Sequence, residues 1–235
     1  RMTSGEGTFA DIDRQSDEAA SALARLGVKQ GDVVSLMLPN CAEFVVLWFA
    51  VSKLGAVMAP LNTAFRGQIL LDAANLVESR VLFAHASLRD LWSSARGVFE
   101  TIDTIIVVGG KAASVNETDY AAFLKAGSAL SPPSPPISTT DPCLLLYTSG
   151  TTGRSKAAII SNRFVLAQAA GVIKGLGLKE DDVLYCPYPL FHLDASVMTI
   201  APALLLRTVA AIGERFSLSR YWDEVRALQA TVFDF

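Results

Sequence analysis

Residues 147–156 combine hydroxyl groups, glycines and one lysine in a single short segment. The segment reads Tyr-Thr-Ser-Gly-Thr-Thr-Gly-Arg-Ser-Lys and directly follows an apolar run at 144–146. Gly150 and Gly153 let a backbone bend and bring its N–H groups close to an anion, while the hydroxyls donate further hydrogen bonds. Lys156 adds a compact positive charge. The segment therefore predicts a loop that binds the phosphates of ATP.

The same segment differs from a P-loop, which has the pattern G-x-x-x-x-G-K-[ST] with a hydroxyl that reaches a magnesium ion. Five residues after Gly150 stands Ser155 instead of glycine, and Lys156 is followed by Ala157. The metal-binding hydroxyl of the P-loop pattern has no counterpart here. A surface turn rich in Ser, Thr and Gly is the structural alternative.

A second group of chemically useful residues follows the apolar run at 183–186. The sequence Pro-Tyr-Pro-Leu-Phe-His at 187–192 places Phe191 and His192 just after the expected strand. Ligands of open α/β sheets bind at the carboxyl edge of the strands, so this turn is a candidate substrate pocket. The alternative is structural, because an imidazole in a proline-rich turn can simply hydrogen-bond the backbone. His85 belongs to no recognisable motif, and we expect a surface or turn residue there.

The composition describes a folded chain that acts on small molecules. Its 235 residues are 51% hydrophobic, and the net charge of −3 without a dense Lys/Arg block gives no sign of nucleic-acid binding. Charged residues or proline interrupt the two most apolar stretches, so no transmembrane span is expected. Residues 1–6 show no secretory signal. Cys41, Cys143 and Cys186 have no metal-binding spacing, and we expect them to be reduced in a cytoplasmic protein.

Apolar runs bounded by glycine and proline alternate with amphipathic stretches along the chain. Helices are expected over 9–26, 42–54, 68–78, 88–99, 162–175, 196–206 and 219–229, and strands over 33–38, 56–59, 81–84, 104–108, 143–147, 157–161, 183–186, 208–211 and from 231. Asn40 and Asn162 are plausible N-caps of the helices that follow them. Residues 131–136, Ser-Pro-Pro-Ser-Pro-Pro, form a stiff connector. The alternation predicts a doubly wound α/β fold.

Four separated segments resemble the adenylate-forming superfamily, which contains acyl-CoA and aryl-CoA synthetases, luciferases and peptide-synthetase adenylation domains. Residues 147–156 are similar to its phosphate loop, although Ser155 stands where the family usually has proline and Ala157 where it usually has glycine. The other three segments also follow the family order; they are Leu-Pro-Asn at 38–40, Leu-Gly-Ala-Val at 54–57 leading to Pro-Leu-Asn at 60–62, and Pro-Leu-Phe-His at 189–192.

The resemblance implies the fold and domain organisation. The chain would be the N-terminal portion of the large domain, with two packed α/β subdomains whose sheets are largely parallel. Subdomain one would span about 33–165, and subdomain two would combine 1–32 with 166–235. The small C-terminal lid domain of the family would be absent from this chain.

The resemblance also implies a reaction and the residues that carry it. A carboxylic acid would be activated by ATP to an acyl-adenylate and then transferred to CoA. Lys156 and His192 would be catalytic, and Phe191 and His192 would line the substrate pocket. The ATP-binding residues would be Thr148, Ser149, Gly150, Thr151, Thr152, Gly153 and Lys156, with Thr152 on Mg²⁺. The matching histidine is usually missing from peptide-synthetase adenylation domains, so His192 favours a CoA ligase.

Three family segments are not found in the chain: the acidic residue of Tyr-Gly-x-Thr-Glu, the ribose-binding aspartate of Thr-Gly-Asp, and the lysine of the C-terminal domain. We therefore expect a fragment that is inactive alone. Three other functions stay open, namely a nucleotide-binding module without catalysis, an amino-acid-activating domain and a P-loop phosphotransferase. The sequence does not indicate the acid or the oligomeric state.

Overall fold

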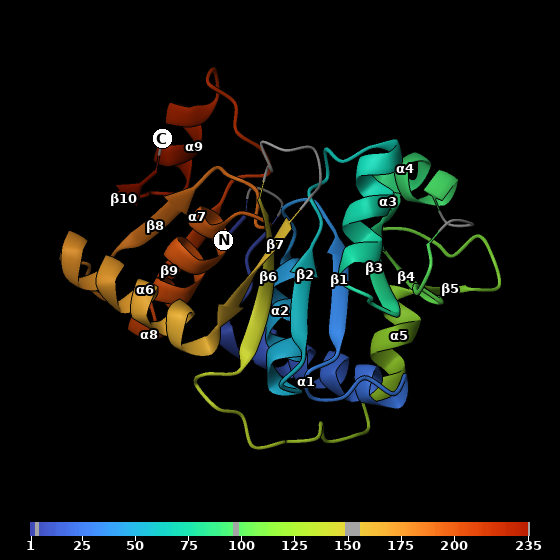
Figure 1. The fold of residues 1–235 in the computed structure, drawn as a ribbon. Coiled ribbons are helices and arrows are strands. Elements are labelled where there is room, and N and C mark those ends of the chain that lie inside the picture. Colours follow the sequence, from blue (N-terminus) through green and yellow to red (C-terminus); the bar gives the residue numbers. More distant parts are fainter. Residues whose placement is uncertain (3–4, 96–98, 149–155, 235) are drawn as a thin grey trace.

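The larger sheet contains the strands of the first two thirds of the chain. The computed structural model describes residues 1–2, 5–95, 99–148 and 156–234. In these residues a seven-stranded sheet has the order β5-β4-β3-β1-β2-β6-β7 (Figure 1). Neighbouring strands are parallel, except that β6 and β7 are antiparallel. The strands are β1 Val33–Met37, β2 Val57–Pro60, β3 Val81–His85, β4 Thr104–Val108, β5 Glu117–Asp119, β6 Pro142–Thr148 and β7 Lys156–Ser161.

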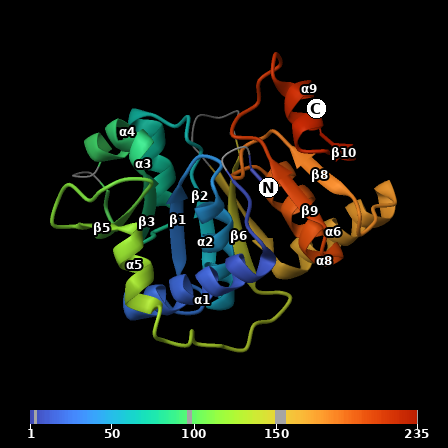
Figure 2. The same cartoon turned by 180° about the vertical axis from the view of Figure 1, so that it is seen from behind.

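Helices cover both faces of this sheet. In β3, Val81 and Phe83 belong to one buried cluster, whereas Leu82 and Ala84 belong to another, as expected when successive side chains point to opposite faces. One face is covered by α1 (Phe9–Arg25), α2 (Ala42–Lys53) and α5 (Tyr120–Gly127), and the other by α3 (Gly67–Leu76) and α4 (Arg89–Ala95) (Figures 1 and 2). The predicted doubly wound α/β architecture is confirmed.

A smaller parallel sheet of order β10-β8-β9 lies beside the first. Its strands are β8 Val183–Cys186, β9 Val209–Ile212 and β10 Val232–Phe233. The helices of this part are α6 Asn162–Leu176, α7 Leu193–Ala195, α8 Ala201–Leu206 and α9 Tyr221–Ala227, with a π-helical segment, Ser196–Ile200, between α7 and α8.

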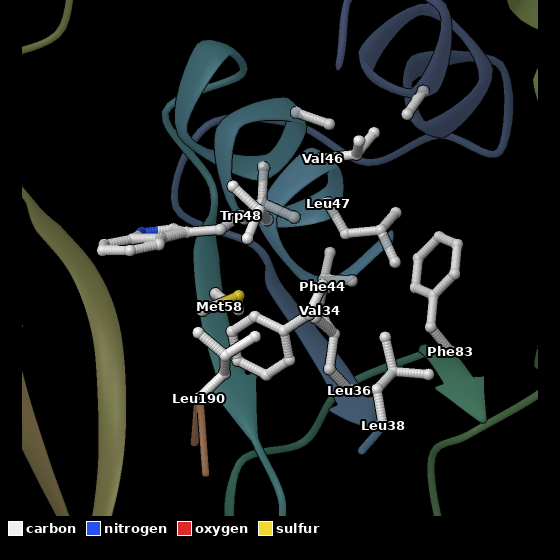
Figure 3. Close-up of a cluster of buried hydrophobic side chains, with 14 of the residues drawn as sticks. Val34, Leu36, Leu38, Phe44, Val46, Leu47, Trp48, Met58, Phe83 and Leu190 are labelled. Atoms are coloured by element: carbon white, nitrogen blue, oxygen red, sulfur yellow. The ribbon is translucent and has the colours of Figure 1, made fainter. Parts of the chain in front are cut away.

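Helix α2 belongs to the core that the two sheets share. Its residues from Phe44 to Trp48, together with Ala50 and Val51, are buried, and a helix that is apolar on every side needs cover on every side. The same cluster continues into Leu190, Ile200 and Ile212 of the second part of the chain. Figure 3 shows Leu190 among side chains of β1, β2 and α2.

Helix α1 is attached to the first sheet's helices, whereas the residues before it reach the second sheet. Lys53 at the end of α2 forms ion pairs with Asp13 and Asp17 of α1, with N–O distances of 2.6 and 2.5 Å. In contrast, the backbone of Arg1 accepts a hydrogen bond from Ile212, and Met2 forms a parallel bridge with Ile212. The N-terminal segment therefore spans both sheets.

Two expected helix caps are wrong. Helix α6 is capped by Ser161, whose hydroxyl accepts a hydrogen bond from the N–H of Phe164, and not by Asn162. The cap position of α2 is Cys41, and its side chain makes no capping hydrogen bond. Asn40 lies one position before this cap, and its side chain hydrogen-bonds backbone groups of Tyr188, Leu190 and Gly213. In both cases a polar residue beside the true cap had the right chemistry for capping but the wrong place in the backbone.

Other elements also differ from expectation, among them the π-helical segment within the helix expected over 196–206. The short strand β5 and helix α5 were not expected, and the stretch expected as a helix from 88 begins with a 3₁₀ turn, Ala86–Leu88, before α4. Residues 131–136 are free of helix and strand, as predicted for a connector. Within the described ranges, no helix is both long and apolar enough to cross a membrane.

Candidate active site

The hairpin of β6 and β7 holds the two ends of the predicted phosphate loop together. Thr148, the last residue of β6, is paired with Lys156, the first residue of β7, and both are exposed. Ser149, Gly150, Thr151, Thr152 and Gly153 lie outside the described residues. The structure therefore places Thr148 and Lys156 at the carboxyl end of β6.

Tyr147 fixes the end of β6 to helix α3. Its hydroxyl donates a hydrogen bond of 2.8 Å to the carbonyl oxygen of Ala73, and its ring packs edge-on against Phe65 with a centroid distance of 6.1 Å. Burial raises the pKa of Tyr147, so the hydroxyl keeps the proton that it donates. The residue before the loop is thus held by α3, a role that the sequence pattern did not reveal.

The turn after β8 presents Phe191 and His192. The N–H of His192 donates to the carbonyl oxygen of Pro189 at 2.9 Å, and the carbonyl oxygen of His192 accepts from the hydroxyl of Ser196 at 2.8 Å. The imidazole of His192 is exposed and does not cap α7, although His192 occupies the cap position. The ring of Phe191 is half-buried, and its centroid lies 4.7 Å from the centroid of the His192 imidazole. The backbone contacts build the turn and leave the imidazole facing solvent.

Asn40 brings the carboxyl edges of the two sheets together. It follows β1, and its side-chain nitrogen donates to the carbonyl oxygens of Tyr188 at 2.9 Å and Gly213 at 2.7 Å. Its side-chain oxygen accepts from the N–H of Leu190 at 2.7 Å. Tyr188 and Leu190 follow β8, and Gly213 follows β9. Since β6 is parallel to β2, and β2 to β1, the end of β6 lies on this same edge. The β6–β7 hairpin, which carries the ends of the predicted phosphate loop, and the His192 turn therefore lie on one side of the molecule.

A cavity of about 730 Å³ lies away from these residues, between the N-terminal segment, α2 and α8. Its apolar walls include Val45, Phe49, Leu204 and Ile212. None of the predicted site residues that the structure describes lines this cavity. We therefore assign the candidate active site to the shared carboxyl edge of the two sheets and not to this cavity.

The three cysteines and His85 show no sign of a chemical role. Burial raises the pKa of Cys143 and of Cys186 to about 11, and burial together with the charge of Glu43 raises that of Cys41 to about 12. The side chain of His85 accepts a hydrogen bond from the N–H of Ser87 within a turn. No cluster of three His, Cys, Asp or Glu side chains that could hold a metal ion occurs in the part of the chain described.

Known proteins are similar to this chain in sequence and in fold. A family described as AMP-binding enzyme matches residues 3–235. Long-chain fatty acid transport protein 6 of Mus musculus is 33% identical over 234 residues, which are 97% of this chain and 37% of that protein. Crotonobetaine/carnitine–CoA ligase of Salmonella typhi is 30% identical over 230 residues, which are 96% of this chain and 44% of that protein.

A solved structure of the anthranilate CoA ligase AuaEII in complex with anthranoyl-AMP has a TM-score of 0.92 and 23% identity. The match covers 99% of this chain and 45% of that chain, and at this identity it shows the fold. The present chain thus spans less than half the length of these relatives. Because the family match covers nearly all 235 residues, the chain belongs to the AMP-binding enzyme family.

Proposed function

We propose that the full-length protein is an acid–thiol ligase that activates a carboxylic acid with ATP and transfers the acyl group to CoA. The observation that carries the proposal is the shared carboxyl edge, where Asn40 joins the His192 turn to the sheet that bears the phosphate-loop hairpin. Family membership over the whole chain supports it. Two of the relatives are CoA ligases, and one was solved with an acyl-adenylate.

The reaction explains why a phosphate loop and an acid pocket would share an edge. A carboxylate oxygen of the acid attacks the α-phosphorus of ATP, and pyrophosphate leaves with the electrons of the broken P–O bond. The CoA thiol then loses its proton to solvent, its sulfur attacks the acyl carbon, and AMP leaves as a phosphate anion with the electrons of the broken C–O bond. The first step needs the carboxylate held against the α-phosphorus, and the second needs the CoA sulfur held against the acyl carbon of the adenylate, which is how positioning contributes to such a rate.

The loop would stabilise negative charge on the phosphates. Lys156 would face the β- and γ-phosphates, where its ammonium offsets charge in the transition state, and the backbone N–H groups at Gly150 and Gly153 would bind the same oxygens. We assign Thr152 as the protein ligand of a magnesium ion, which would be held mainly by the ATP phosphates and would neutralise their charge. Phe191 and His192 would form a wall of the acid pocket.

The products of the reaction distinguish the proposal from its alternatives. Full-length protein should be incubated with ATP, magnesium, CoA and a panel of fatty, aryl and amino acids, with AMP, ADP, pyrophosphate and thioester measured. AMP, pyrophosphate and thioester with a fatty or aryl acid would support the proposal. ADP would indicate phosphotransfer, an adenylate formed only with amino acids would indicate an amino-acid-activating domain, and no product would indicate a nucleotide-binding module.

The 235-residue chain alone should not complete the reaction. We propose that its two sheets are parts of two subdomains of a larger domain, and that acidic, ribose-binding and lysine residues outside this sequence are required. The same assay on the isolated chain tests this proposal. Thioester formation at roughly 1 per second or faster would contradict it.

A further inference from the structure

We propose that Asn40 is a positioning residue for the acid pocket, a role that rests on the proposed function. The side chain holds the turn of residues 187–192 at a fixed place relative to the seven-stranded sheet. Through that turn it would set where Phe191 and His192 stand with respect to the phosphate-loop hairpin. Asn40 would act through the turn, because its side-chain amide is occupied by backbone groups of Tyr188, Leu190 and Gly213.

The hydrogen bonds of Asn40 leave its amide a single workable orientation. Two carbonyl oxygens, of Tyr188 and Gly213, lie on one side of the amide, and the N–H of Leu190 lies on the other. Only an NH₂ group facing the carbonyls and an oxygen facing the N–H satisfy all three partners. The network therefore specifies asparagine, because no other side chain of this length offers two donors and one acceptor.

The turn has few backbone bonds of its own. Pro187 and Pro189 carry no N–H group, so neither can donate to a neighbouring strand. Leu190 is 1% exposed and packs in the core shared by the two sheets, so its N–H needs a partner inside the protein. Asn40 is that partner, and it binds the turn on both sides of Pro189.

The link starts from an interior strand of the larger sheet. Asn40 stands three residues after Met37, the end of β1, and β1 lies between β2 and β3 in the larger sheet. The first residue after the anchored Leu190 is Phe191, and the next is His192. A displacement at Leu190 would thus be passed directly to both side chains of the proposed pocket.

The decisive variant is Asn40→Asp in the full-length protein. The new carboxylate can still accept from Leu190, but its second oxygen would face two carbonyl oxygens and repel them. Protonation would restore one donor, and both burial and the carbonyls favour the protonated form. We expect kcat for adenylate formation to fall roughly 10- to 100-fold at pH 8, as a small misplacement of reacting groups does. The loss should shrink as the pH is lowered toward 6, relative to the wild-type profile.

Asn162→Asp is a matched control. The amide nitrogen of Asn162 also donates to two backbone carbonyl oxygens, of Ser138 and Asp141, at 3.2 and 3.3 Å, but these join the residues just before β6 to α6. This variant should keep kcat and both KM values. For Asn40→Asp, KM for the acid should rise while KM for ATP stays within about threefold, because the hairpin that binds ATP is anchored separately through Tyr147.

Two outcomes would overturn the inference. One is Asn40→Asp enzyme with a lowered melting temperature but unchanged kcat, KM values and pH profile, which would make Asn40 a stabilising residue only. The other needs no variant: rapid hydrogen exchange at the amide of Leu190 in wild-type protein would show that the bond to Asn40 is not maintained. Wild-type protein that forms no adenylate with any acid would instead refute the proposed function, and the exchange measurement would remain informative about the link itself.

Discussion

The packing of α5 on α1 leaves no room for a side chain at Gly127, the last residue of α5. A Cβ atom at this position would lie 1.9 Å from the carbonyl oxygen of Glu18 and 2.8 Å from the backbone nitrogen of Ala22. Both obstacles are backbone atoms of α1, so no side chain can rotate away. The oxygen would have to retreat by roughly 1.5 Å to reach ordinary contact at 3.4 Å. Overpacking typically costs about 1 to 3 kcal/mol, and we expect Gly127→Ala to reach or exceed the upper value.

The same substitution at Gly171 should raise the free energy of unfolding instead of lowering it. Gly171 lies inside helix α6, is exposed, and has nothing within 4 Å of the position of a Cβ atom. Alanine is favoured over glycine in a helix interior by about 0.5 to 1 kcal/mol, so Gly171→Ala should stabilise the protein by that amount. Urea unfolding of the full-length variants, followed by tryptophan fluorescence, measures both changes. Gly127→Ala protein as stable as Gly171→Ala would refute the close approach of the two helices.

Four further predictions concern single side chains of the full-length protein. Lys156→Ala should weaken productive ATP binding by about 1.5 to 3 kcal/mol and acid binding less, because in the proposed site the ammonium would face phosphate; unchanged KM for ATP and adenylation rate would exclude this role. His192→Ala should lower kcat/KM without lowering the melting temperature, and full activity would favour a purely structural turn. Burial alone would raise the pKa of Glu117, but hydrogen bonds from a backbone N–H and from Arg89 outweigh it and hold the pKa of this carboxyl below its usual value. Its stabilising contribution is therefore complete above the pKa of an unfolded glutamate and is lost as the pH falls through the lower pKa of the folded protein, so the stability of Arg89→Gln should depend less on pH in the acid range than that of wild type. Finally, native Cys143 should react with iodoacetamide at pH 8 roughly a hundredfold more slowly than an unfolded thiol, because its pKa is raised to about 11; equal rates in native and unfolded protein would contradict this.

The strands that could be predicted residue by residue are those with local signals. Thr104–Val108 and Val183–Cys186 agree with the expected ranges because each is an uninterrupted apolar run that stops at a turn. Runs of this kind indicate a strand with both faces buried, and the structure buries four residues in each.

The elements that were missed depend on distant partners. Strand β5 is three residues long and polar, and its buried residue Glu117 is compensated by Arg89, which lies 28 positions earlier in the chain. Nothing in residues 117–119 alone distinguishes such a strand from a loop. The π-helical segment was likewise read as ordinary helix, although the hydroxyl of Thr199 donates to the carbonyl oxygen of Asp194, five residues earlier. Hydroxyls that bind backbone in this way compete with regular helical bonds.

The candidate site also combines features that the local sequence indicates with features that depend on distant partners. The segment at 147–156 and the turn at 187–192 can be proposed from residue types, because the chemistry expected of each is contained within a few consecutive positions. The sequence marks Asn40 as part of the Leu-Pro-Asn segment at 38–40 and as a possible helix cap, but it does not reveal the residue's partners, which are 148 to 173 positions away. Those hydrogen bonds appear only in the structure, where Asn40 stands one position before the real cap.

Because α2 is apolar on every side, it would be exposed to solvent during translation until later parts of the chain cover it. Val45 and Phe49 of α2 line the same space as Ile200, Leu204 and Ile212, which are synthesised more than 140 residues later. At usual rates of translation this delay is on the order of 10 to 30 s. During that interval the nascent sheet would present an uncovered apolar helix, the kind of surface that chaperones bind and that promotes aggregation. Expression of this protein should therefore be most sensitive to temperature and chaperone supply in the interval before residues 200–212 are synthesised. The cause would be this delay and not weak packing in the finished protein.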